Sequence, residues 1–302
     1  MRLTKATDAN LYAELRASMG FQNMGLASSR VPGTMTFLDS EKFLGDICSN
    51  KHIVGVITNS VYAQALAERR PDIKLHTSVD PRQTFYETYN ARAEQNNRLL
   101  KPSRIHATAL IHERAYVAPY GVIIEAHVII EPMVTVMPGV RIGSHTQIRA
   151  GSAIGVEGFE HKRVGGHLLT VIHDRYVVIG EDVEIGANNT IARGLMGEDT
   201  EIGSGTKTDC LVHIAHCAKI GKRCLIPASA MIAGSVTIGD DVWIGPNASI
   251  SSQVSIGDGA FVTIGSVVVK DVAAKSHVSG NFAIDHMSFL RILRNATHAI
   301  KR

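Results

Sequence analysis

The sequence is poor in aromatic residues, which make up 5% of its 302 residues and include a single tryptophan. This scarcity argues against a core built around large rings and favours aliphatic side chains stacked in repeating layers. The chain also lacks a secretory signal and any apolar run long enough to span a membrane. We therefore expect a cytoplasmic protein without an integral membrane segment.

Paired cysteine motifs and concentrated charge are missing as well. The four cysteines, at positions 48, 210, 217 and 224, form no C-x-x-C pair, which favours reduced thiols over disulfides or a metal site. The 31 basic and 28 acidic residues are interspersed and give a net charge of +3. The sequence therefore predicts no nucleic-acid-binding face.

What the sequence does contain is a six-residue repeat. From position 202 to position 268 an aliphatic residue or Thr recurs at every sixth position, and the ladder extends back to Ile105. A period of six fits neither a helix nor a long alternating strand, but it is typical of short strands joined by tight turns. We therefore expect a mainly β protein with a parallel β-helix from Ile105 to Val268, each hexad pointing two side chains inward.

The ladder is interrupted twice, at residues 155–178 and 192–201. Insertions into a solenoid usually become loops that leave one face, often the binding face. We expect both loops to form walls of a substrate site.

The repeat also divides the chain into three regions. We expect a small α/β domain over 1–100, the β-helix domain over 101–280 and a C-terminal helix over 281–302. Helical patterns at 6–19 and 81–94 and a short apolar strand at 52–58 support the first region. Asp285 is placed to cap the C-terminal helix.

Two segments carry a resemblance to a known family: DCLVHIAHCAKIG (209–221) and VEIGANNTIARG (183–194). With the hexads, they resemble the left-handed β-helix hexapeptide-repeat acyltransferase superfamily, in particular UDP-3-O-acylglucosamine N-acyltransferase and nucleotide-sugar N-acetyltransferases. The segments MTFLDSEKF (35–43) and VDPRQTFYE (79–87) resemble the uridine-binding domain of the former. The resemblance implies a left-handed coil, a homotrimer with sites between neighbouring β-helices, an acyl thioester donor and a UDP-linked amino sugar.

Three residues are candidates for the chemistry. His216 matches the family's catalytic His in an I-A-H segment, at an outward turn position, and a general base is what acyl transfer to an amine requires. The resemblance implies that Asp209 orients His216 and that the amide of Gly234, eighteen residues further on, binds the oxyanion. A surface histidine, an Asp that caps its own turn and a plain turn glycine are the alternatives without function.

One departure from the family bears on the acyl donor. Gln253 stands where the lipid A enzyme has a second His, and Gln cannot exchange protons near neutral pH. The short C-terminal tail is also smaller than the extension that holds acyl carrier protein in that enzyme. These departures favour acetyl-CoA as the donor and an O-antigen amino sugar as the acceptor. The alternative is transfer from a long-chain 3-hydroxyacyl carrier protein to UDP-3-O-acylglucosamine.

Further polar and aromatic positions are candidates for substrate binding. Phe37 and Ser40 match the family's uridine-binding segment, although Phe37 is equally suited to a core. The remaining candidates lie in or beside the repeats: Asn188, Asn189, Arg193, His213 and Gln253.

Two readings compete with acyl transfer. A zinc carbonic anhydrase-like site would use His213 and His216, but the third histidine about one coil away is missing, so no metal is expected. A non-catalytic solenoid would show a flat repetitive outer face, whereas the outer positions here are irregular.

Overall fold

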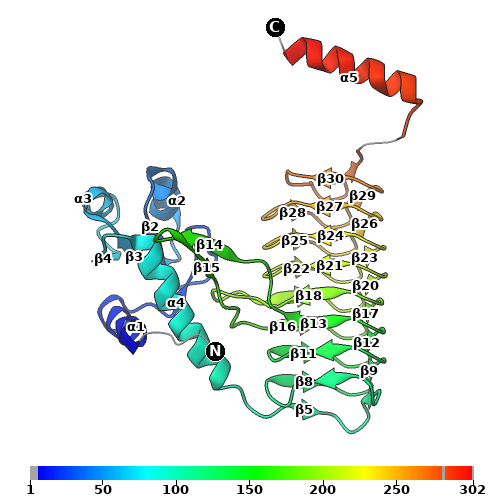
Figure 1. Ribbon diagram of the computed structural model, residues 1–302, viewed down its shortest axis with the longest axis horizontal. Coiled ribbons are helices and arrows are strands. Elements are labelled where there is room, and N and C mark those ends of the chain that lie inside the picture. Colours follow the sequence, from blue (N-terminus) through cyan, green and yellow to red (C-terminus); the bar gives the residue numbers. More distant parts are fainter. Residues whose placement is uncertain (1–5, 281–282, 301–302) are drawn as a thin grey trace.

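The computed structural model describes residues 6–280 and 283–300 and contains two packed parts followed by a helix (Figure 1). The first part is a four-stranded parallel sheet in the order β1-β2-β3-β4 with helices around it. Its elements are α1 (Ala6–Met19), β1 (Asn23–Met24), β2 (Thr34–Leu38), the 3-10 helix η1 (Glu41–Phe43), α2 (Leu44–Ser49), β3 (Ile53–Thr58), α3 (Ser60–Arg69), β4 (Lys74–Thr77) and α4 (Pro81–Arg98).

Local sequence signals explain where these helices begin. The Asp80 side chain accepts a hydrogen bond from the Gln83 N–H, and Pro81 occupies the first turn of α4, where a missing N–H costs nothing. Asn59 caps α3 in the same way through the N–H groups of Val61 and Tyr62.

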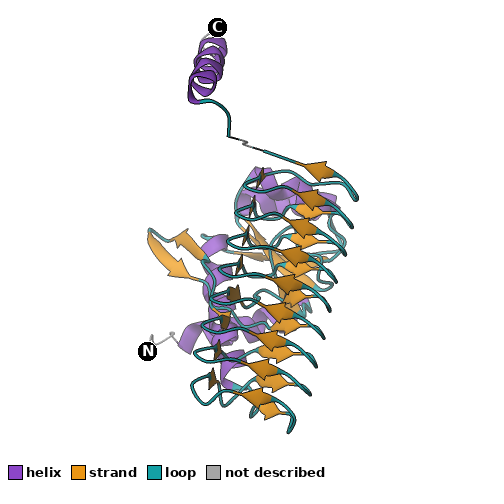
Figure 2. Cartoon of the chain, turned by 90° about the vertical axis from the view of Figure 1, so that its right-hand side faces the viewer, coloured by secondary structure: helices purple, strands orange, loops and turns teal. Residues whose placement is uncertain are grey.

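The second part is the expected left-handed parallel β-helix, with three faces and eighteen residues in a regular coil. Figure 2 shows the coils stacked with corresponding strands aligned. The first face comprises β5 (Arg104–Ile105), β8 (Val122–Ile124), β11 (Val140–Ile142), β16 (Val177–Ile179), β19 (Thr200–Ile202), β22 (Lys219–Ile220), β25 (Thr237–Ile238) and β28 (Ser255–Ile256).

The other two faces are built in the same way from parallel strands. The second face comprises β6 (Leu110–Ile111), β9 (Ile129–Ile130), β12 (Gln147–Ile148), β17 (Glu184–Ile185), β20 (Lys207–Thr208), β23 (Leu225–Ile226), β26 (Trp243–Ile244), β29 (Phe261–Val262) and β31 (His277–Val278). The third face comprises β7 (Tyr116–Val117), β10 (Thr135–Val136), β13 (Ala153–Val156), β18 (Thr190–Ala192), β21 (His213–Ile214), β24 (Met231–Ile232), β27 (Ser249–Ile250) and β30 (Val267–Val268).

The hexad ladder forms the core of the β-helix. The recurring aliphatic residues and the small residues four positions later are buried in one continuous cluster, as at Ile214 and Ala218. Ile105, in the first coil, is 47% exposed because no coil lies below it. Stacking of coils therefore supplies the apolar burial that no single coil could provide.

Glycine in the repeat allows neighbouring coils to approach each other closely. At Gly221 a Cβ would lie 2.4 Å from the Gly239 carbonyl oxygen in the next coil, so a side chain does not fit. The glycine is therefore not needed for a left-handed backbone conformation. That conformation occurs two residues after Gly221, at the non-glycine residue Arg223 (φ 54°).

The two interruptions leave the β-helix as expected. Ile142 pairs with Ile179, thirty-seven positions on, and Ile179 pairs with Ile202, twenty-three positions on. The longer insertion contains the antiparallel hairpin β14 (His161–Val164) and β15 (His167–Thr170), which extends toward α4 in Figure 1.

Both insertions pack against the α/β part. Leu195, Met196, Val164 and Val171 share a buried cluster with residues of α1 and α4, such as Leu15. The insertions thereby hold the α/β part beside the first face.

The C-terminal helix α5 (His286–Ile300) stands apart from the stack in Figure 1. Asp285 accepts a hydrogen bond from the Ser288 N–H at 2.9 Å, so it caps this helix as expected. Residues 281–282 and 301–302 of the expected C-terminal region lie outside the described residues.

Candidate functional site

His216 lies at the corner where the chain turns from the third face to the first. It lines a cavity of about 580 Å³ between the β-helix and the α/β part. One wall is the segment 25–31 before β2, a second is the loop 195–199, and a third is the first face with its corner residues. Both expected loop walls therefore contribute to this cavity, since Glu160 from the longer insertion lines it as well.

The imidazole of His216 is held between two glycines. A Cβ at Gly234, one coil above, would lie 2.6 Å from His216 Cε1, and a Cβ at Gly158 would lie 3.1 Å from Cδ2. Only residues without side chains leave this space for the ring. The Gly234 N–H has no hydrogen-bond acceptor among the described residues and stays available to a ligand.

Glu160 faces His216 across the cavity. Its Oε2 lies 3.6 Å from His216 Nε2, and its Oε1 forms an ion pair of 2.6 Å with Lys162 Nζ. Burial lowers the pKa of His216, while the charge of Glu160 acts in the opposite direction and raises it. His216 is therefore neutral at pH 7, and a carboxylate is in place to stabilise the imidazolium once a proton arrives.

A second histidine, His173, lies beside His216. Their ring centroids are 5.7 Å apart, and His173 is buried, with an exposed fraction of 1%. Burial, together with the smaller effects of the charges of His216 and Arg193, lowers the pKa of His173 to about 4. The Gly158 N–H donates to His173 Nε2 at 3.2 Å, so the proton of this neutral ring is on Nδ1, which has no partner among the described residues.

Helix α4 fixes the segment that carries His173. Asn97 Nδ2 donates to the His173 carbonyl oxygen at 3.0 Å. Asn90 bonds the segment twice, donating to the Thr170 carbonyl and accepting from the Ile172 N–H. The position of His173 therefore depends on docking of the α/β part.

Three of the sequence-predicted residues come together here. His216 and Gln253 line the same cavity, and Gly234 lies directly above His216, as the eighteen-residue spacing predicts. The chemical roles assigned to these residues stay predictions.

Asp209 does not lie beside His216. It occupies the corner between the second and third faces, where its Oδ1 accepts a hydrogen bond from the Cys210 N–H at 2.7 Å. Asn188 lies at the same corner, one coil below. Seven residues carry the chain across the whole third face, so the expected contact with His216 is absent within this chain and Glu160 takes that place.

Asn189 and Arg193 are buried, which contradicts their expected exposure to a substrate. Asn189 bonds Thr208 Oγ1 at 2.7 Å and the Val212 N–H at 2.6 Å inside the β-helix. Arg193 is 5% exposed and donates to the Arg175 carbonyl and to Asn97 Oδ1, linking the β-helix to α4.

The remaining predicted residues are remote from the His216 cavity or face another way. The ring of Phe37 packs against Phe85 at a centroid distance of 5.0 Å, and Ser40 precedes η1 without a side-chain capping bond. His213 lies on the third face, where its Nδ1 bonds Thr190 Oγ1 at 2.7 Å. A nucleotide role for Phe37 and Ser40 and a substrate role for His213 stay predictions.

Sequence reasoning missed Glu160, Lys162 and His173. All three lie in the first interruption, which was expected to wall the site. The signal that could have found them is a run of ionisable residues in an otherwise aliphatic solenoid.

In residues 6–280 and 283–300, no three or more His, Cys, Asp or Glu side chains gather in a way that could hold a metal ion. No helix of the described chain is long and apolar enough to cross a bilayer.

Comparison with known proteins identifies the six-residue repeat. The bacterial transferase hexapeptide (six repeats) family matches residues 121–155 and 235–270. UDP-3-O-acylglucosamine N-acyltransferase 1 of Gloeobacter violaceus is 50% identical over 153 residues, which cover 51% of this chain and 44% of the relative. The enzyme of the same name from Wolinella succinogenes is 35% identical over 164 residues, covering 54% and 51%.

Among solved structures, LpxA from Acinetobacter baumannii matches 62% of this chain and 76% of its own, with 26% identity and a TM-score of 0.44. The chain spans about half the length of the curated relatives it matches.

These relatives overturn the expected donor and pathway. They are named for N-acylation of UDP-3-O-acylglucosamine, so acetyl-CoA as donor and an O-antigen sugar as acceptor are wrong. The expectation relied on Gln253 and on a short C-terminal tail. Neither feature determines how long an acyl chain the site accepts.

Over its β-helix, the chain carries the bacterial transferase hexapeptide repeat and resembles the left-handed β-helix acyltransferases, the UDP-3-O-acylglucosamine N-acyltransferases among them.

Proposed function

We propose that the chain is an N-acyltransferase that moves an acyl group from the thioester of an acyl carrier protein to the amine of UDP-3-O-acylglucosamine. The observation that carries the proposal is the neutral, half-buried imidazole of His216 in a cavity beneath the free N–H of Gly234. The names of the relatives support the acceptor.

The neutral amine nitrogen of the sugar attacks the thioester carbon, the carbonyl oxygen becomes an oxyanion, and His216 accepts the proton that the nitrogen loses. The oxyanion then collapses, the C–S bond breaks, and the imidazolium of His216 returns the proton to the leaving sulfur, which is released as the thiol. The Gly234 N–H is placed to bind the oxyanion, and the charge of Glu160 stabilises the imidazolium of His216.

His173 packs beside His216 without lining its cavity, and its Nδ1 is buried. Because its pKa is about 4, it is uncharged at pH 7 and adds no positive charge beside the base. We therefore assign to His173 a positioning role for His216.

The proposal includes a homotrimer. Large apolar side chains point outward from the second and third faces and stay exposed in a single chain, among them Leu110, Leu225, Phe261 and Val267. Exposed apolar surface of this kind is typical of subunit contacts. Light scattering on the purified protein tests the proposed homotrimer, and a monomer at micromolar concentration would contradict the homotrimer.

The activity test uses purified protein, UDP-3-O-acylglucosamine and 3-hydroxyacyl carrier protein, with product detected by mass spectrometry. His216→Ala should lose a factor of about 10² to 10⁴ in kcat. His127→Ala, at an exposed corner of a lower coil, is the matched control. Absence of transfer by the unmodified protein, or full activity of His216→Ala, would overturn the proposal.

A further inference from the structure

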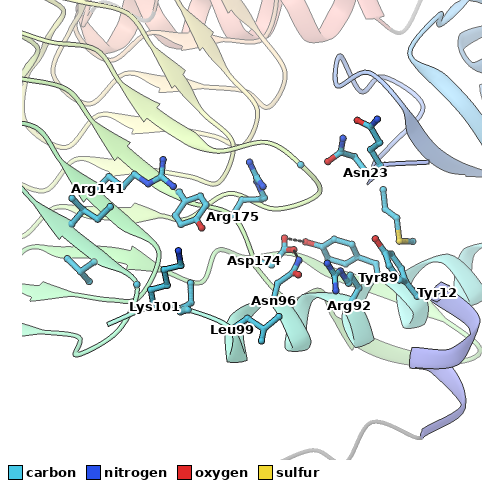
Figure 3. Close-up of a pocket in the computed structure, with 18 of the residues that line it drawn as sticks. Tyr12, Asn23, Tyr89, Arg92, Asn96, Leu99, Lys101, Arg141, Asp174 and Arg175 are labelled. Atoms are coloured by element: carbon cyan, nitrogen blue, oxygen red, sulfur yellow. Dashed lines mark hydrogen bonds between the residues drawn. The ribbon is translucent and has the colours of Figure 1, made fainter. Parts of the chain in front are cut away.

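A second cavity, of about 930 Å³, lies between the helices α1 and α4 and the lower coils of the β-helix (Figure 3). We call it the basic cavity. Its lining shares only Gly197 with that of the His216 cavity. Its volume is at the upper end of the range of small-molecule sites, about 300–1,000 Å³.

Cationic side chains dominate the lining of the basic cavity. They come from both of its sides: Arg16, Arg92, Lys101, Arg104, Arg141 and Arg175. The one carboxylate of the lining is Asp174. The formal charge of the lining is therefore more positive than the +3 of the whole chain, although the sequence shows no clustered basic segment.

Asp174 does not neutralise these cations. Its Oδ1 accepts from the Tyr89 hydroxyl and its Oδ2 from Asn96 Nδ2, each at 2.7 Å. Figure 3 shows the Tyr89 contact beside the opening between the two parts. Both carboxylate oxygens are thus engaged by neutral donors.

Most of the cations also lack an anionic partner. Arg175 pairs with Asp199 at 3.0 Å. Arg16, Lys101 and Arg104 form no ion pair with any residue that the structure describes. All three are exposed to solvent, so an anion between them gains their attraction without breaking an ion pair.

Three of the arginines lie over aromatic rings. Arg141 lies over the ring of Tyr176 at 4.3 Å, Arg175 over the same ring at 5.7 Å, and Arg92 over the ring of Tyr12 at 5.2 Å. In Figure 3, Arg141 and Lys101 project from the β-helix side while Arg92 and Tyr12 project from the helical side. Guanidinium groups held in this way keep their donor edges for a ligand, and such edges match phosphate oxygens.

We propose that the basic cavity binds a small ligand that carries a diphosphate group. Several unpaired cations on opposite walls suit an anion with adjacent negative charges better than a single carboxylate. The cavity is bounded by α1 and α4 on one side and by the lower coils on the other, which suits a small molecule better than a polymer, whose phosphate chain needs a continuous surface. Occupation would join the α/β part to the β-helix, so the ligand stabilises the docked arrangement that fixes His173.

The test is isothermal titration calorimetry of the full chain with inorganic pyrophosphate, with orthophosphate as the comparison at equal ionic strength. Pyrophosphate should bind at least tenfold more tightly than orthophosphate and raise Tm. The double variant Arg104→Ala/Arg141→Ala should weaken pyrophosphate binding at least tenfold. Arg114→Ala, an exposed arginine of the same lower coils outside the lining, should bind as the unmodified chain does.

Two further arms separate this site from the proposed activity and identify the source of the diphosphate. His216→Ala should keep full pyrophosphate binding, because its cavity is a different one. UDP that displaces pyrophosphate points to a nucleotide ligand, and UDP that does not points to free pyrophosphate; both support the site. Equal binding of orthophosphate and pyrophosphate, no binding at millimolar pyrophosphate, or undiminished binding by the double variant would overturn the proposal.

Discussion

Glu160 Oε2 lies 3.6 Å from His216 Nε2, although the two residues belong to different structural units, a loop insertion and a coil corner. The acid expected at this place, Asp209, lies at another corner. Glu160 is only partly exposed and keeps Lys162 as a second partner. We therefore expect Glu160 to be a positioning residue that sets the pKa and the orientation of His216.

The first prediction concerns Glu160→Gln. Glu160 raises the pKa of His216 against the effect of burial, so its loss should lower that pKa further. The base must be neutral, and activity falls as the pH drops through its pKa. The acid limb of the kcat profile should therefore shift to lower pH, and the plateau should fall about tenfold as the imidazolium loses its carboxylate.

A purely structural role for Glu160 would reduce kcat without moving the acid limb. Glu157→Gln, an exposed acid of the same loop, serves as the matched control and should leave the profile in place. An unshifted limb in Glu160→Gln would contradict the assigned role.

The second prediction concerns the stability of the fold at acid pH. His173 has a pKa of about 4 in the folded chain against an ordinary value of 6.5, so the unfolded chain takes up its proton first as the pH falls. The free energy of unfolding should therefore decrease between pH 6.5 and 4, by about 3 kcal/mol from this residue. His173→Gln, which can still accept from the Gly158 N–H, should flatten that decrease in urea titrations.

The exposed His145 provides the control, since His145→Gln should leave the pH dependence of unfolding unchanged. If His173→Gln unfolds with the same pH dependence as the unmodified chain, His173 is not buried in its neutral form.

The sequence was sufficient to predict the β-helix because the signal is local and repeated. Each aliphatic position, such as Ile214, is buried by the coil above and the coil below, so one pattern repeats throughout the core. The same spacing predicts that Gly234 lies above His216, and the cap at Asp285 is a local signal of the same kind.

The site could not be predicted in full because its second half comes from insertions without a period. Glu160 and His173 reach His216 only because α4 bonds the loop through Asn90 and Asn97, which are distant in sequence. Asn189 was instead expected in the site and does not belong to it. Its polar side chain suggested an exposed turn, but inside a solenoid it bonds the backbone of the next coil.

The third prediction tests the contact between Gly234 and His216. In Gly234→Ala the new Cβ would lie 2.6 Å from Cε1 of the imidazole, so the ring must move. We expect kcat to fall at least a hundredfold with little change in the far-ultraviolet circular dichroism spectrum. Gly45→Ala is the control because its Cβ would enter open space in α2, and it should keep full activity. Normal activity of Gly234→Ala would show that the ring position is not critical.

The fourth prediction separates the two adjacent asparagines. Asn189→Ala removes the acceptor of the Val212 N–H inside the β-helix and leaves that donor buried without a partner, which costs about 1–3 kcal/mol. Asn188 is exposed at a corner with φ 55°, and Gly adopts this conformation freely, so Asn188→Gly should change stability little. Urea denaturation should therefore show a lower midpoint for Asn189→Ala alone. Since Asn189 is 1% exposed, KM for the nucleotide sugar should stay within twofold of the unmodified value in the folded variant. A raised KM without loss of stability would instead return Asn189 to the substrate site that its sequence context suggested.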